Sequence, residues 1–162
     1  RVDAAGNRRP LHIKQALDVI LFSGQRTDAI PGLVLPTQDG ERTIMVANRY
    51  FALELLALDG TMEEATLGER FHLLMCLEGN VQLEYVGHQG DYTILSPGES
   101  VLVPACLDEY LLHGTGKLMK CYVPDIHRNI IEPLAFHGYP FSKITTMVAG
   151  LGDYRTSYLP LA

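Results

Sequence analysis

The chain has 162 residues, of which 47% are hydrophobic and 20% are charged, as in an ordinary globular domain with a sizeable core. The net charge of -6 argues against nucleic-acid binding, and every apolar run is far shorter than the roughly 20 residues of a membrane-spanning helix. We therefore expect a soluble, cytoplasmic protein that binds neither nucleic acid nor membrane. The sequence starts at Arg1 inside a polar stretch, which suggests an excerpt of a longer protein.

The first expected element is an amphipathic helix over residues 11–22. Ile13, Leu17 and Ile20 recur at helical spacing, and Pro10 stands where a helix loses nothing by lacking an N–H. Glycine and proline then recur from residue 24 to residue 42, which predicts a long surface loop. Residues 1–42 are thus predicted to form an N-terminal helix and a connecting loop.

Residues 43–124 have the texture of an all-β domain, with turn residues about every ten positions. Hairpin ends are predicted where glycine allows a positive φ at little conformational cost, namely at Asp59-Gly60, Gly79-Asn80 and residues 114–116. About eight short antiparallel strands predict a jelly roll. They are expected at 44–47, 51–58, 71–77, 81–85, 92–95, 100–103, 110–113 and 118–123.

Residues 125–162 show no clear period and are left as an unassigned C-terminal extension, in which Pro133 interrupts a possible helical turn. The three cysteines, Cys76, Cys106 and Cys121, form no CxxC pair. Free cysteine behaves as a small buried hydrophobe, so we expect reduced thiols in the core.

Two groups of charged residues are candidate sites. Asp108 and Glu109 would suit acid and base chemistry if their environments separated their pKa values, although a solvated loop explains them more simply. The second group surrounds the start of the first helix, where cations and free N–H groups attract a sugar phosphate. The alternative is a solvated basic helix end. The group contains Arg8, Arg9, His12 and Lys14.

Residues 90–105, GDYTILSPGESVLVPA, resemble the second conserved motif of the cupins, with tight turns at both ends of one strand. Metal-binding cupins carry an HxH pair on an earlier strand and a histidine after the motif, and this sequence has neither. His72 stands alone between apolar residues, and a lone histidine is more often a surface residue or a hydrogen-bonded core residue than a metal ligand. We therefore expect no metal in this barrel.

Three blocks of the sequence resemble bacterial class I mannose-6-phosphate isomerases. Residues 1–20, RVDAAGNRRPLHIKQALDVI, are similar to a family segment that runs roughly RVDxxGxxRELHIxKALDVI. Residues 50–60, YFALELLALDG, and residues 98–105, GESVLVPA, resemble later blocks of that family in the same order. Pro10 departs from the family glutamate, which leaves Arg9 and His12 as the matched polar candidates for the substrate phosphate.

The resemblance implies a cupin-type double-stranded β-helix and a zinc enzyme that interconverts mannose 6-phosphate and fructose 6-phosphate. It also implies that the zinc ligands and the catalytic arginine belong to an upstream catalytic cupin domain, so this chain alone would hold no cofactor and be inactive. The chain would then be the C-terminal supporting domain of the isomerase. Two alternatives stay open, namely a non-catalytic sugar-binding or regulatory cupin and a dimerisation module with a broad apolar barrel face that includes residues 71–77.

Overall fold

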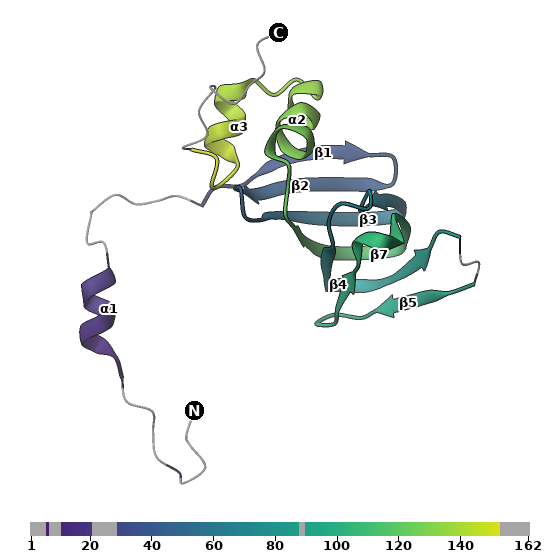
Figure 1. The fold of residues 1–162 in the computed structure, drawn as a ribbon, viewed down its shortest axis with the longest axis horizontal. Coiled ribbons are helices and arrows are strands. Elements are labelled where there is room, and N and C mark those ends of the chain that lie inside the picture. Colours follow the sequence, from purple (N-terminus) through teal and green to yellow (C-terminus); the bar gives the residue numbers. More distant parts are fainter. Residues whose placement is uncertain (1–5, 7–10, 21–28, 88–89, 153–162) are drawn as a thin grey trace.

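The computed structural model describes residues 6, 11–20, 29–87 and 90–152, which are mostly β-structure (Figure 1). One short helix, α1, precedes the strands, and three helical segments and a 3-10 turn complete the chain. The elements are α1 (Ile13–Val19), β1 (Leu33–Thr37), β2 (Gly40–Ala47), β3 (Ala52–Ala65), β4 (His72–Tyr85), β5 (Tyr92–Leu95), β6 (Ser100–Val103), η1 (Ala105–Leu107), β7 (Glu109–Tyr122), the π-helix η2 (Ile126–Ile131), α2 (Glu132–Phe136) and α3 (Phe141–Met147).

All strand pairs among the described residues are antiparallel, in the order β1-β2-β3-β7-β4-β5. β6 pairs with the first part of β4, on the same edge at which β5 pairs with its second part. Side chains alternate between buried and exposed along β3 and β4, as expected for strands with one face in a core. The all-β jelly-roll prediction is confirmed. The division at residues 42 and 124 stays a prediction.

The predicted surface loop over residues 24–42 is wrong for its second half. Residues 33–37 form β1 and pair with residues 40–44 of β2, so a hairpin stands where glycine and proline suggested irregular chain. Pro36 is tolerated because β1 is the edge strand of the sheet, where a missing N–H interrupts no ladder. Residues 21–28 lie outside the described part.

The predicted hairpin ends at Gly60, Gly79 and Gly114 are also wrong. These glycines lie inside three 14-residue strands, and Gly60 pairs with Gly114 while Gly79 pairs with Gly116. All three predicted glycines have positive φ, between 77° and 138°. They bend the long strands in mid-course, so what reads as two short strands is one strand that changes direction.

The tail packs on the sheet beside β1 and β2. Ile130, Leu134 and Ile144 are fully buried and share one hydrophobic cluster with Leu33 and Ile44. The backbone of Ala149 accepts from Ala47 N at 2.8 Å and donates to Met45 O at 3.0 Å, which fixes the end of α3 to β2. The extension 125–152 is therefore an integral layer of the domain, visible above β1 in Figure 1. Residues 153–162 are not described.

α1 lies apart from the sheet in Figure 1, and the described structure buries none of its side chains. No helix among the described residues is long and apolar enough to cross a membrane. All three cysteines are free, but only Cys76 is a buried thiol. The expectation of core thiols is wrong for Cys106, which is exposed in the η1 turn after Pro104.

Candidate functional site

A layer of charged side chains crosses the interior of the barrel. Along β3 the inward positions are Ala52, Glu54, Leu56, Leu58, Met62 and Glu64, so two carboxylates interrupt an apolar series. Along β7 the inward Lys120 stands between Leu118 and Tyr122. The layer lies between two separate hydrophobic clusters, one under the tail and one between β3, β4, β6 and β7.

Lys120 is the centre of this layer. Its Nζ lies 2.8 Å from Glu54 Oε2 and 2.8 Å from Glu64 Oε2, and all three side chains are at most 3% exposed. The guanidinium of Arg42, from β2, forms ion pairs with the same two carboxylates and is 25% exposed. Ten residues of straight strand span about 33 Å, so Glu54 and Glu64 meet on one ammonium because β3 bends back at Gly60.

Aromatic side chains enclose the charged layer. Tyr122 donates a hydrogen bond to Glu54 Oε1 at 2.5 Å, and its ring lies 4.9 Å from Lys120 Nζ. His72 Nδ1 lies 2.8 Å from the hydroxyl of Tyr110, and the imidazole contacts both tyrosine rings edge-on or tilted. Of the two alternatives for a lone histidine, the structure shows that His72 is a hydrogen-bonded core residue and not a surface one.

Burial and pairing fix the charge states of this layer. Burial by itself would raise the pKa of Glu54, but Lys120 and Arg42 outweigh it and hold that pKa below its ordinary value. Burial, together with the positive charge of Lys120, lowers the pKa of His72 to about 4, so the imidazole is neutral at pH 7. Burial also raises the pKa of Tyr122 above its ordinary value. The neutral Tyr122 therefore keeps its proton for the bond to Glu54.

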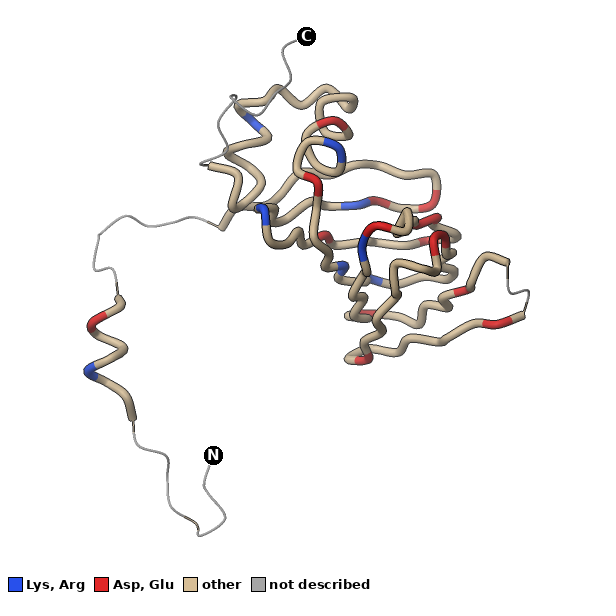
Figure 2. The backbone as a smooth tube through the Cα atoms, viewed as in Figure 1, with Lys and Arg blue, Asp and Glu red and all other residues tan. Residues whose placement is uncertain are grey.

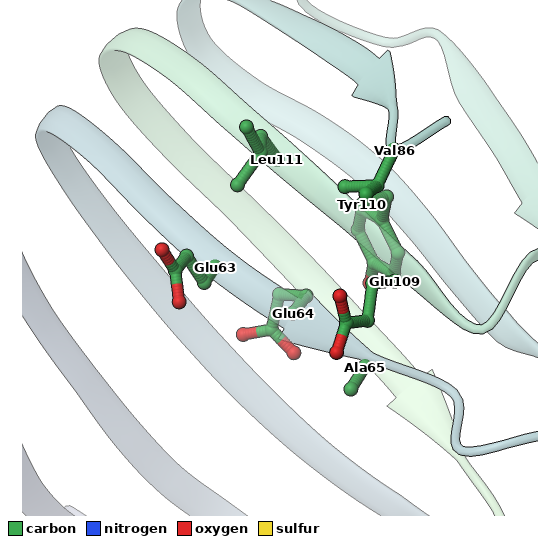
Figure 3. Close-up of a pocket in the computed structure, with 7 residues that line it drawn as sticks. All are labelled: Glu63, Glu64, Ala65, Val86, Glu109, Tyr110 and Leu111. Atoms are coloured by element: carbon green, nitrogen blue, oxygen red, sulfur yellow. The ribbon is translucent and has the colours of Figure 1, made fainter. Parts of the chain in front are cut away.

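Two hollows are lined by Glu64 of this layer. One, of about 210 Å³, lies at the barrel mouth between the loop before β4 and the helix η2, and Arg42, Lys120 and His72 line it together with Arg70 and Asn129. The other, of about 380 Å³, is lined by the ends of β3 and β7. Figure 3 shows the carboxylates of Glu63, Glu64 and Glu109 around it, beside the Tyr110 ring.

The structure places the residues singled out from the sequence as follows. Asp108 and Glu109 are both exposed; Asp108 follows the η1 turn, and Glu109 is the first residue of β7 and borders the larger hollow. His12 is exposed directly before α1. Arg8 and Arg9 lie outside the described residues. The phosphate role of Arg9 and His12 stays a prediction.

The described residues do not supply a zinc site. No three His, Cys, Asp or Glu side chains in the described part of the chain come together in a metal-binding arrangement. His72 is bonded to a tyrosine, and the inward carboxylates of Glu54 and Glu64 are already paired with cations. Tetrahedral zinc needs a set of such donors, and this interior offers two engaged carboxylates and one imidazole. We therefore derive no step of a reaction through zinc in this barrel.

Sequence reasoning did not find the charged layer, although a signal was present. Glu54 and Lys120 occupy positions where the period-two alternation demands apolar residues, and a charge at such a position needs a buried partner. Figure 2 shows acidic and basic positions interleaved on the central strands rather than separated into patches. The partner of each charge, however, lies on a distant segment.

Residues 41–123 match the family model described as mannose-6-phosphate isomerase, cupin domain. No curated protein sequence matches the chain.

Two solved structures have similar folds. The mannose 6-phosphate isomerase from Bacillus subtilis superposes with a TM-score of 0.60 at 21% identity, over 75% of this chain and 37% of that one. A mutant phosphomannose isomerase from Salmonella typhimurium gives a TM-score of 0.52 at 19% identity, over 71% of this chain and 28% of that one. The chain thus corresponds to little more than a third of the Bacillus enzyme. Because the family model covers residues 41–123, which is half of the sequence, the chain belongs to the family of mannose-6-phosphate isomerase cupin domains.

Proposed function

We propose that this chain is the C-terminal domain of a mannose-6-phosphate isomerase and supports an upstream catalytic cupin that binds zinc. The reaction interconverts mannose 6-phosphate and fructose 6-phosphate by moving a proton between C1 and C2. The family match and the order of the three isomerase-like blocks support this assignment. In this proposal the metal and the catalytic residues belong to the upstream domain, and this chain contributes packing.

The observation that carries the proposal is an apolar outer face on the sheet. Register places Leu102 of β6, Leu73 of β4, Cys121 of β7 and Leu53 of β3 opposite one another in a single row. Leu102 is 58% exposed and Leu73 is 40% exposed. Met75, Leu77 and Phe71 extend the same face and are exposed to a similar degree.

An antiparallel sheet with one face in the core normally turns polar residues to water on the other face. Here both faces of β4 are apolar, because inward Leu74 and Cys76 alternate with outward Leu73 and Met75. Large exposed apolar patches mark surfaces that another protein or domain covers. α1 supports the same conclusion, since Ile13 and Leu17 are more than half exposed on a helix that buries no side chain here.

The test is zinc-dependent isomerisation of mannose 6-phosphate by the full-length parent, with this chain assayed beside it. We expect activity in the parent alone. Leu73→Asp should lower the thermal stability and activity of the parent, because it places a charge in a domain interface. Ile94→Asp, at an exposed apolar position on β5, is the matched control and should change neither.

Two outcomes would contradict the proposal. A parent that carries zinc ligands yet does not isomerise mannose 6-phosphate would remove the isomerase assignment. Concentration-dependent dimerisation of the isolated chain that Leu73→Asp abolishes, with no effect of that variant on the parent, would make the apolar face a dimer interface.

A further inference from the structure

The hollow of about 210 Å³ at the barrel mouth is separate from the apolar outer face and has no part in the proposed domain packing. The inner charged layer forms the floor of this hollow, and the guanidinium of Arg42 is the partly exposed member of that layer. Its rim is formed by Arg70, Arg128 and Asn129, and the ring of Tyr122 contributes a wall. A protein built only for packing has no need of this polar interior, because well-packed apolar residues are usually at least as stabilising as buried ion pairs.

The charges around the hollow balance. Four cations line it, Arg42, Arg70, Lys120 and Arg128. Two carboxylates, Glu63 and Glu64, line it as well, and two more, Glu54 and Glu69, pair with the lining cations. Four positive and four negative groups give no net charge, and His72, with its pKa lowered to about 4, adds none at pH 7. The hollow therefore has no net attraction for a phosphate or an ammonium group.

Fixed hydrogen-bond donors face this space. Arg70 donates to Asn129 Oδ1 and to Glu69, so the amide of Asn129 is oriented and its NH₂ group stays available. Arg42 uses its two terminal nitrogens in the ion pairs and has five N–H donors in all. Ion pairs hold these side chains in place before any ligand arrives, which lowers the entropic cost of binding.

We propose that the barrel mouth binds a neutral polyhydroxyl ligand of about one sugar ring, held by hydrogen bonds from Arg42 and Asn129 against Tyr122. Hydroxyl groups both donate and accept, which suits a hollow lined by four cations and two carboxylates and balanced by the paired carboxylates of Glu54 and Glu69. The volume lies below the roughly 300–1,000 Å³ of pockets for drug-sized ligands, which favours one ring over an oligosaccharide. The proposal does not depend on the isomerase assignment, because it concerns unphosphorylated sugar and this chain alone.

The experiment is an amide-resolved NMR titration of the full 162-residue chain with mannose, fructose, mannose 6-phosphate and inorganic phosphate. We expect saturable shifts with a neutral sugar at Arg42, Lys120 and Tyr122 and within residues 63–72 and 126–133. Inorganic phosphate should produce no saturable shift there, and mannose 6-phosphate should bind no more tightly than mannose.

Three variants separate binding from folding. Arg42→Gln should weaken sugar binding about tenfold or more. Asn129→Ala leaves the inner ion pairs intact and should weaken it as well, while Lys117→Gln, which removes an exposed pair with Glu78, should not. The proposal fails if the folded chain shows no saturable shift with either neutral sugar, if phosphate binds more tightly than sugar, or if Asn129→Ala binds as the unaltered chain does.

Discussion

Lys120 neutralises two carboxylates that would otherwise face each other inside the barrel. Lys120→Met keeps the length of the side chain and removes its charge, leaving Arg42 alone against Glu54 and Glu64. Breaking a buried ion pair from one side costs about 3–5 kcal/mol, because the remaining charge stays buried. We expect a loss of that size in the free energy of unfolding at pH 7, measured by urea denaturation.

Lys117→Met is the matched control on the same strand. Lys117 pairs with Glu78 at the surface, where both side chains are about half exposed, so its removal should cost less than about 1 kcal/mol. Equal losses in the two variants would mean that the inner ion pairs contribute no more than surface pairs do.

His72 makes stability depend on pH. Its pKa is about 4 in the folded chain because of burial and of Lys120, and the ordinary value is 6.5. Between these two pH values the unfolded chain binds more protons at His72 than the folded chain does. The contribution of the neutral, buried His72 to the free energy of unfolding is therefore complete above pH 6.5 and is lost as the pH falls to about 4. The difference between the two pKa values corresponds to about 3 kcal/mol of unfolding free energy.

His72→Gln retains a hydrogen-bonding partner for Tyr110 and removes the titration. Urea denaturation at pH 7 and at pH 4 should show a smaller fall in unfolding free energy for the variant than for the unaltered chain. Comparing the two falls cancels the other groups that titrate in this range, such as Glu54. Identical falls would show that His72 is not shielded from protons in the folded chain.

At the scale of the strand, the bends depend on backbone contact between neighbouring strands. Gly79 has φ +77°, and a Cβ there would lie 2.2 Å from Thr115 O. Gly98, in the turn before β6, has φ +88° and nothing within 4 Å of its Cβ position. Both replacements by alanine incur the conformational penalty of positive φ, about 1–2 kcal/mol.

We expect Gly79→Ala to lower the free energy of unfolding by about 1–3 kcal/mol more than Gly98→Ala does, because only the alanine at position 79 forces β4 and β7 apart. Thermal and urea denaturation of the two variants measure the difference. If the two alanines cost the same, close approach of the strands at the bend is not what requires glycine at position 79.

At the scale of the whole molecule, α1 and the packed tail behave differently. Ile130 is fully buried in the tail, and Ile130→Ala should cost about 2–5 kcal/mol in the isolated chain. Leu17 is 52% exposed on α1, and Leu17→Ala should leave the free energy of unfolding of the isolated chain unchanged. If the upstream cupin covers α1, the same Leu17→Ala should lower the melting temperature of the parent. An unchanged parent would leave α1 without a role in domain packing.

Much of the architecture was predictable from local pattern. Residues 81–85 were predicted to be a strand and lie in β4, and residues 90–105 predicted the cupin arrangement of β5 and β6. The glycines at positions 60, 79 and 114 were predicted to be hairpin ends because a positive φ is equally compatible with a turn and with a bend inside a strand. Pro36 led to the prediction of a loop in place of β1, because the sequence does not show which strand will be at the edge of the sheet.

The sequence by itself determined the all-β class and the family resemblance, because these depend on residues a few positions apart. Only the tertiary structure decided that Glu54 and Glu64 share Lys120, that the tail covers β1 and β2, and that the outer face of β4 is exposed. Each of these depends on where β3, β4 and β7 bend and on which distant segments then meet. Pairing between such segments is set by the packing of the whole chain.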